Sequence, residues 1–481
     1  MSGGEGRAAG RMSGNVREHA ATVVVAALSS FFASTLILGV DVMVAAMDPR
    51  LIAESGTFKV VLMMVALIFI LIALYVGSIV TANTFSTIIA GRTRTIALYR
   101  LVGATSNRVR ARVAGEGLVT GAVGAVIGFV LAELVIVALV TFGPGLGWLP
   151  ERAEYPVFNP LALAAVVIVA LTTWVAAWSG SRRVGKVSPI EATGASVELR
   201  AEDARNRSGR TVWALVLMIG GLALIAIGVI AGLVTPLALL MSFVGGLLSF
   251  TGIALGAHVV MPPLLRLAGR ALGGGPTGRL AAANAVRFPE RSARATIGLV
   301  IGVTLVTMFA VALASYEQMT LVAFAQDPEM QAQLSETLTI TTGVFTGLVG
   351  FSAVIAAVGM VNTLSLGVLQ RTRELGLLRA LGFTGRQVRA MVMAESVQMT
   401  LAALGFGLVL GTFYGWVAAQ SLVGSQVGLM PPTLPWLVLA VSCSSALRWR
   451  SEPRSPPRGV RSGCRRWPRS PSTEASARCR D

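Results

Sequence analysis

Long uninterrupted runs of apolar residues restrict this chain more than any other feature. A hydrocarbon core of ~30 Å is crossed by about 20 helical residues. Apolar residues make up 54% of the chain and charged residues only 13%, far from the balance of a soluble domain. The sequence therefore predicts an all-α polytopic membrane protein with about ten transmembrane helices. The apolar runs lie near residues 21-40, 59-80, 114-140, 160-179, 211-232, 236-260, 296-315, 338-361, 391-420 and 434-447, the last being short.

The positions of Lys and Arg predict the orientation of these spans, because short cytosolic loops hold most of the basic residues. Basic segments alternate with acidic ones, and ten spans with both termini in the cytosol place each loop on its expected side of the plasma membrane. The net charge of +17 is explained by these loops and by a basic tail, so we expect contact with membrane lipid and not with nucleic acid. The basic segments are the N-terminus, 92-112, 181-210, 266-294 and 371-389, and the acidic ones are 41-58, 141-159 and 316-338.

An internal repeat lies within this pattern. From Asn83 the chain reads NTFSTIIAGRTRTIALYRLVGATSNRVRARVAGEG, and from Asn362 it reads NTLSLGVLQRTRELGLLRALGFTGRQVRAMVMAES. The two copies align without a gap, each residue of the first having its counterpart 279 positions later. We infer that the membrane domain is duplicated.

Each copy predicts the same local structure: a span ends, a short Arg-rich helix follows, a glycine turns the chain and the next span begins. Gly103 and Gly382 suit the left-handed position that closes a helix. Thr384 and Gln387 form a capping box in the second copy, whereas Arg108 in the first copy removes the box. The short basic amphipathic helix fits either a lipid headgroup surface or a partner protein.

The stretch GSRRVGKVS at 180-188 matches the start of a phosphate-binding loop. Val187 stands where that loop needs a Ser or Thr for magnesium, and Ser188-Pro189 disfavours the helix that should follow. We interpret the segment as the basic flank of a membrane helix and predict no ATPase site in this chain.

The stretch RTRELGLLRALG at 371-382 resembles the signature of the FtsX-like, or MacB-like, permease domain of ABC transporters. SRRVGKVSPIEA at 181-192 is similar to the end of that domain. The resemblance implies two four-helix domains joined by a helix pair. The expected divisions are a first permease domain at 12-195, a linker with two spans at 196-279, a second permease domain at 280-447 with an incomplete last span, and a tail at 448-481.

In permeases of this family the short helix between the second and third spans docks on a separate cytosolic ATPase. The resemblance thus implies a permease driven by an ABC ATPase, two copies per chain, with ATP used by the partner and no cofactor bound directly. Thr95 and Ala97 replace the Glu and Gly of the signature in the first copy, so its contact with the ATPase is expected to differ. The residues implied in coupling are Arg92, Arg94, Arg100, Gly103, Arg371, Arg373, Glu374, Gly376, Arg379 and Gly382.

Many family members carry a large extracytoplasmic domain between the first and second spans of a repeat. Here the corresponding loops, 41-58 and 316-338, are too short for an independent domain. This favours export or extraction of a hydrophobic or lipid-like substrate taken from within the bilayer. The alternative is a signalling or regulatory membrane protein that transmits the same motion without transport.

Within the spans, glycines repeat at every third or fourth position, which predicts close helix packing. The first stripe is Gly117, Gly121, Gly124 and Gly128, and the second is Gly407, Gly411 and Gly415. Glu133 is an acid inside a predicted span, which indicates either a functional site or a side chain that reaches the nearby interface.

Catalytic and metal chemistry finds little support. His19 and His258 are the only histidines and lie far apart, and the three cysteines fall in the last stretch without zinc-type spacing. That stretch, from about Ser442, breaks the last apolar run and is rich in Arg. It is interpreted either as a disordered basic tail on anionic lipid or as the product of a frameshift, which we favour.

Overall fold

The computed structural model describes residues 16-46, 56-91, 93-146, 154-181, 208-271, 289-325 and 380-435. All regular secondary structure in these ranges is helical. The helices are α2 (Val16–Ala46), α4 (Gly56–Gly91), α5 (Thr93–Leu101), α6 (Ser106–Phe142), α7 (Pro160–Gly180), α9 (Ser208–Gly232), α10 (Ala238–Leu255), α11 (Ala257–Ala271), α13 (Pro289–Ala323) and α16 (Gly385–Val427).

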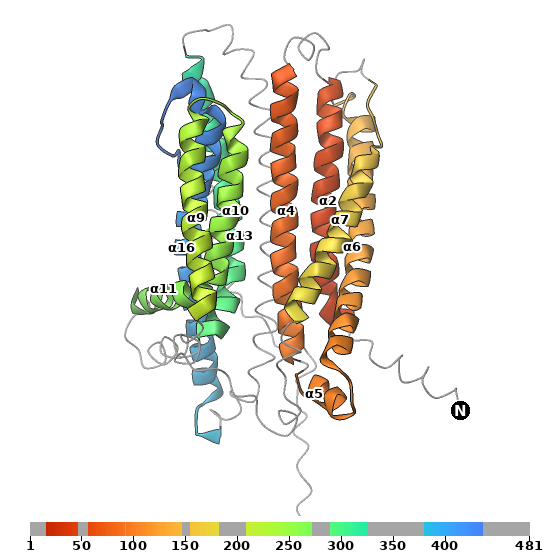
Figure 1. Cartoon of the computed structure of the whole chain (residues 1–481), viewed down its shortest axis with the longest axis vertical. Helices are drawn as coiled ribbons and strands as arrows, with labels where there is room; N and C mark the ends of the chain where they lie inside the picture. Colours follow the sequence, from red (N-terminus) through yellow and green to blue (C-terminus); the bar gives the residue numbers. More distant parts are fainter. Residues whose placement is uncertain are drawn as a thin grey trace, which may run out of the picture.

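The long helices run side by side in two groups (Figure 1). The first group holds α2, α4, α6 and α7, and the second holds α9, α10, α13 and α16. The short helices α5 and α11 lie at the lower end in Figure 1, which we call the elbow end because it also carries Gly103 and Gly382. The opposite end is called the far end.

Seven helices are long and apolar enough to cross a membrane within the described ranges, and a shorter apolar stretch, Met63–Ile79, lies in α4. An all-α polytopic membrane protein is thereby confirmed. The predicted span at 338-361 and most of the one at 434-447 lie outside the described residues, so the number ten stays a prediction. The domain boundaries stay predictions as well.

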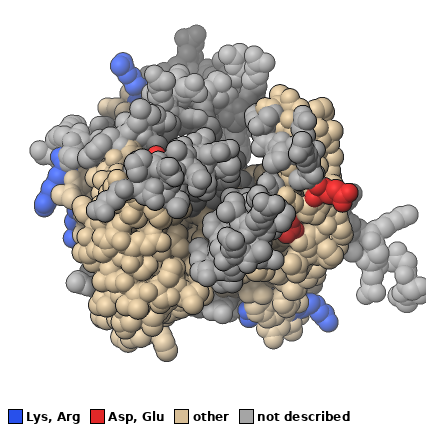
Figure 2. All heavy atoms as spheres, turned by 90° about the horizontal axis from the view of Figure 1, so that it is seen from above, with Lys and Arg blue, Asp and Glu red and all other residues tan. Residues whose placement is uncertain are grey.

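At the far end, Lys59 lies in the first turn of α4, whereas the described connections hold no basic residue. These connections, 143-146, 154-159, 233-237, 324-325 and 428-435, include Glu154 and no Lys or Arg. Figure 2, viewed from this end, shows mostly uncharged described atoms with a few acidic side chains among them, and Lys and Arg side chains at the rim. This distribution supports the predicted orientation, with the elbow end in the cytosol, which itself remains a prediction.

The glycine stripes bring helices into close contact, as the sequence predicts. A Cβ built on Gly128 of α6 would lie 2.1 Å from the carbonyl oxygen of Ala27 in α2. In the second repeat, a Cβ on Gly411 of α16 would lie 2.5 Å from the Cβ of Thr307 in α13. Each stripe therefore lets one helix backbone approach its neighbour more closely than any other residue type allows.

The predicted span at 236-260 is wrong at its elbow end. The α10 helix ends at Leu255, and the chain turns at Gly256 into the separate helix α11. This helix is amphipathic and buries Met261 and Leu265 while Leu267 is exposed. It contains Arg266 and Arg270, predicted to lie in a basic loop, and it packs on α13 and α16. Its position across the end of the bundle is typical of an interfacial helix.

The inserted pair α9 and α10 packs against the second repeat. The hydroxyls of Ser242 in α10 and Ser421 in α16 form a buried hydrogen bond of 2.7 Å. A Cβ on Gly232, at the end of α9, would lie 2.7 Å from the Cα of Ser421. The pair therefore belongs structurally to the second group of helices.

Candidate functional site

Two equivalent turns at the elbow end lead into the long helices α6 and α16. Gly103 has φ +98° and Gly382 has φ +97°, a backbone conformation that side chains disfavour. Each glycine is followed by a threonine that begins the next helix, Thr105 for α6 and Thr384 for α16. We call these turns the first and second elbows, residues 102-105 and 381-384. The prediction of a left-handed glycine in both copies is confirmed.

The two helix caps differ as the sequence predicts. In the second elbow the Gln387 amide donates to Oγ1 of Thr384 at 3.3 Å, and the Gln387 side-chain oxygen accepts from the Thr384 amide at 2.9 Å. In the first elbow Thr105 accepts only one such bond, from the amide of Arg108 at 3.4 Å. The second elbow is therefore held by a reciprocal pair of hydrogen bonds and the first by a single one.

The α5 helix presents apolar side chains in two directions. Ile96 and Ala97 are buried and pack with Ile89 of α4 and with the first turns of α6. Leu101 is 56% exposed, and Val102 of the first elbow is 88% exposed. The counterpart of Val102 in the second copy, Leu381, is 71% exposed. Both elbows thus offer an uncovered apolar residue beside the glycine.

The residues implied in coupling are only partly described. Arg94 and Arg100 lie on α5, between α4 and α6, and Gly103 and Gly382 form the elbows. The remaining ones lie outside the described residues, so their role stays a prediction: Arg92, Arg371, Arg373, Glu374, Gly376 and Arg379.

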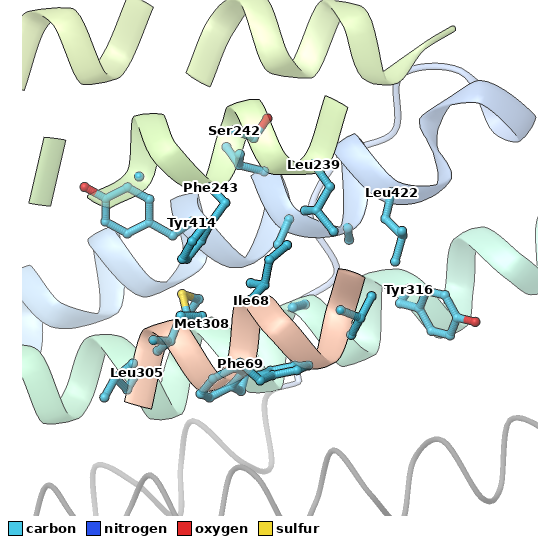
Figure 3. Close-up of a pocket in the computed structure, with 18 of the residues that line it drawn as sticks. Ile68, Phe69, Leu239, Ser242, Phe243, Leu305, Met308, Tyr316, Tyr414 and Leu422 are labelled. Carbon is cyan, nitrogen blue, oxygen red and sulfur yellow. The ribbon is translucent and has the colours of Figure 1, made fainter. Parts of the chain in front are cut away.

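A cavity of about 540 Å³ lies where α4 meets α10, α13 and α16. None of its described lining residues is charged, and nearly all present carbon. Figure 3 shows Tyr414 at one end of the cavity and Tyr316 at the other, with Phe69 and Leu239 projecting between them. The cavity therefore joins the first repeat, the inserted pair and the second repeat.

The cavity extends along much of the membrane-spanning length of the helices that line it. Its lining runs from Val65 to Val76 along α4 and from Leu239 to Phe250 along α10, each about 16 Å at 1.5 Å per residue. Pro236 and Gln426, which lie at helix ends, mark the outer limit. Along α13 the lining runs from Ile301 to Phe324, about 34 Å, which is about the full thickness of a ~30 Å hydrocarbon core.

The inner end of the cavity is aromatic. The Tyr75 hydroxyl is 2.7 Å from Oγ1 of Thr251, and the Tyr414 hydroxyl is 2.7 Å from Oγ of Ser249. The ring of Phe250 lies between the two tyrosines, with centroid distances of 6.3 Å to each. Sequence reasoning missed these residues, because each lies inside an apolar run and the three meet only through tertiary packing.

Glu133 lies in the far half of α6 and does not line the cavity. Its Oε1 is buried and accepts no hydrogen bond from any described residue. The sequence offered two interpretations of Glu133, and its role stays open as a prediction.

The remaining sequence motifs form no site among the described residues. Gly180 is the last residue of α7 and Ser181 caps it, while the rest of the loop-like segment lies outside the described ranges. No group of three or more His, Cys, Asp or Glu side chains is placed to hold a metal ion in the part of the chain that the structure describes. The tail after 435 is likewise outside it.

Comparison with known proteins identifies the repeat. A family model described as FtsX-like permease C-terminal matches residues 67-189 and again residues 346-446. The cavity takes α4 residues from the first matched segment and α16 residues from the second, whereas α10 lies between the two.

Similar curated proteins are permeases of ABC transporters. The chain is 30% identical over 112 residues to an uncharacterized ABC transporter permease, YknZ, of Bacillus subtilis, covering 23% of this chain and 26% of that protein. It is 35% identical over 83 residues to an uncharacterized ABC transporter permease of Methanocaldococcus jannaschii, covering 16% of this chain and 21% of that protein.

A third relative is the macrolide export ATP-binding/permease protein MacB of Shigella boydii, 30% identical over 112 residues, 23% of this chain and 17% of that protein. The matches thus span about a quarter or less of these relatives. The duplicated match and the agreement among the relatives show that this chain carries two FtsX-like permease segments and is similar to ABC transporter permeases, MacB among them.

Proposed function

We propose that this permease subunit is driven by a separate cytosolic ATPase and that it moves a hydrophobic or lipid-like substrate through the cavity between α4, α10, α13 and α16. The uncharged cavity carries the proposal. A charged ligand needs an oppositely charged or strongly polar buried partner, and the described wall is mostly apolar, with hydroxyl and amide groups but no charged side chain.

The depth of the cavity supports a substrate taken from the bilayer. A pocket whose lining extends along α13 for about the thickness of the ~30 Å core is long enough to hold the apolar chains of a lipid. The hydroxyls of Tyr75 and Tyr414 are already paired with Thr251 and Ser249, so they do not require a polar ligand group. With the predicted orientation, the outer limit of the cavity at Pro236 and Gln426 lies on the extracytoplasmic side.

The elbows support coupling to a partner at the cytosolic end. The exposed Val102 and Leu381 occupy equivalent places, which fits two copies of the same ATPase on one chain. A force on the second elbow is transmitted along α16, whose residues from Tyr414 to Gln426 form one wall of the cavity. A conformational step at the elbow is therefore able to change the cavity's shape.

The substrate part of this proposal is tested by filling the cavity. Leu422 projects into the cavity (Figure 3), and Leu422→Trp reduces its volume. Leu134 is 60% exposed on α6, away from the cavity, so Leu134→Trp is the matched control. Both variants and the wild type are purified in the same detergent, and retained lipid is measured by mass spectrometry. We expect Leu422→Trp to lose most of the retained lipid and Leu134→Trp to keep it; equal retention would contradict the proposal.

Transport is separated from signalling in proteoliposomes that contain the permease and its ATPase. A transporter moves a fluorescent phospholipid across the bilayer only with ATP, and Leu422→Trp slows that movement. A signalling protein hydrolyses ATP with no net movement of the lipid. The second result would favour the regulatory alternative.

A further inference from the structure

Three aromatic residues meet at the inner end of the cavity along α4, α10 and α16, and each comes from a different part of the chain. Tyr75 belongs to α4 of the first repeat, Phe250 to α10 of the inserted pair and Tyr414 to α16 of the second repeat. Phe250 meets Tyr75 at an interplanar angle of 75° and Tyr414 at 64°. Such edge-to-face contacts are favourable between aromatic rings.

Hydrogen bonds fix the two tyrosines to the same helix. Thr251 and Ser249, the neighbours of Phe250 in α10, bind the hydroxyls of Tyr75 and Tyr414 at 2.7 Å each. Thr251 also donates to the carbonyl oxygen of Leu247 at 2.6 Å, so the Tyr75 hydroxyl is the donor in its bond to Thr251. Phe250 is 8% exposed. The arrangement is closely packed and is held from both sides.

We propose that Tyr75, Phe250 and Tyr414 form a floor that sets the length of the apolar chain that the cavity accepts. The proposal rests on the proposed lipid-like substrate and adds the residues that select among such substrates. An apolar chain that enters from the far end stops at the floor, because further insertion would break the two hydroxyl pairs and displace the rings. Chains shorter than the cavity leave part of it unfilled and lose contacts.

The central residue of the floor is a feature of this chain and not of the matched family segments. Phe250 lies between residues 67-189 and 346-446, the two stretches that the family model covers. The inserted helix thus supplies the selective element, while the two repeats supply the walls. Residues of α10 are therefore the place to change chain-length preference without altering the repeats.

Gly246, one turn from Phe250 on α10, makes this testable. It lines the cavity, and a Cβ there would meet no atom within 4 Å. Gly246→Leu raises the floor without a steric conflict for the helix backbone, and it replaces a poor helix former. Gly220→Leu is the matched control, because Gly220 of α9 is exposed, also has open space and does not line the cavity. Phe250→Ala lowers the floor.

The experiment uses the full chain in nanodiscs made from equal amounts of phosphatidylcholines that differ only in acyl length. After purification in detergent, the retained lipids are quantified by mass spectrometry for each variant. Relative to the wild type, we expect Gly246→Leu to shift the retained lipids to chains shorter by about two methylene groups, and Phe250→Ala to shift them to longer chains, as the freed volume predicts. Gly220→Leu keeps the wild-type distribution.

The outcomes separate the two proposals. Lipid retained with the same chain lengths in Gly246→Leu, Gly220→Leu and the wild type overturns the floor and leaves the lipid-like substrate standing. Retention by the wild type no greater than that of Leu422→Trp overturns the substrate proposal itself. If Phe250→Ala does not fold, the shift in Gly246→Leu decides alone.

Discussion

The two repeats start their third spans from matching elbows but surround those spans differently. In the first repeat, α6 packs on α2 and α7 and leaves a broad apolar surface, including Val119 at 64% exposed. In the second, α16 packs on α13 and is also covered by α9, α10 and α11, and its Gln398 and Gln420 are buried. Of the two third spans, α6 and α16, only α16 lines the cavity.

This difference teaches how a duplicated domain acquires one asymmetric site. The repeats keep the shared devices, which are the elbow glycine, the helix cap and the glycine stripe. The inserted pair, α9 and α10, packs mainly on the second repeat, and the cavity forms where α10, α13 and α16 meet α4 of the first repeat. We expect changes to the shared devices to affect both repeats and changes to α10 to affect the cavity alone.

The largest effect is expected where the glycine stripes touch a neighbouring backbone. Gly128→Val and Gly411→Val each place carbon atoms where a Cβ alone would come within 3 Å of α2 or α13. The backbone cannot yield without moving the helices apart, so we expect a loss of about 3 kcal/mol in folding free energy for each. Thermal unfolding in detergent measures it. Gly115→Val and Gly405→Val, at positions with open space, are the controls and should lose less. If one of the two variants keeps the stability of the wild type and the other does not, the glycine stripes of the two repeats are not equivalent.

A smaller effect is expected at the elbows. Gly103→Ala and Gly382→Ala force a side chain into a positive-φ conformation, which costs about 1-2 kcal/mol. The second elbow leads directly into α16, which lines the cavity, whereas the first leads into α6, which does not; ATP-driven lipid movement should therefore fall further in Gly382→Ala than in Gly103→Ala. Thermal unfolding and the proteoliposome measurement together check this. Equal transport losses would show that the two elbows act alike.

The helix caps sharpen the comparison further. Thr384→Ala removes a reciprocal capping box and should cost about 1 kcal/mol, whereas Thr105→Ala removes one long hydrogen bond and should cost less. Hydrogen exchange at the first turns of α16 and α6 measures the difference. Faster amide exchange at the first turn of α6 in Thr105→Ala than at the first turn of α16 in Thr384→Ala would contradict the predicted order of the two capping energies.

The smallest effect is expected at the contact between the inserted pair and α16. The bond between Ser242 and Ser421 joins two transmembrane helices, and such bonds contribute about 0.6 kcal/mol on average. A double-mutant cycle with Ser242→Ala and Ser421→Ala measures the coupling energy. No measurable coupling would mean that this hydrogen bond adds nothing to the other contacts that hold the pair against α16, which include the bond between Ser249 and Tyr414 and the close approach at Gly232.

Much of the fold follows from the sequence because its signals are local. Apolar runs locate the spans, the spacing of Gly124 and Gly128 predicts a packing face, and the Thr384 and Gln387 pair marks the start of α16. The sequence did not predict α11 as a separate helix, because its apolar residues continue the apolar run of α10. The turn at Gly256, followed by Pro262 and Pro263, is the signal that was available.

The cavity could not be predicted in the same way. The partners of its floor are separated by 176 positions for Tyr75 and Thr251 and by 165 for Ser249 and Tyr414. Each lies in an apolar run where an aromatic or hydroxyl residue is unremarkable by itself. Their meeting depends on how α4, α10 and α16 pack, which no periodicity in one segment encodes. The elbows, in contrast, are encoded within a few residues.

Purification from native membranes in a gentle detergent, followed by mass spectrometry of the bound proteins, tests the central claim most directly. We expect a P-loop ATPase at one copy per elbow, two per chain. Its loss is expected in the double variant Leu101→Glu and Leu381→Glu, which alters the exposed apolar residues of both elbow regions. Leu146→Glu, 60% exposed at the far end, is the control and should keep the ATPase. An ATPase that remains bound in the double variant, or that is absent from the wild-type complex, would contradict the account.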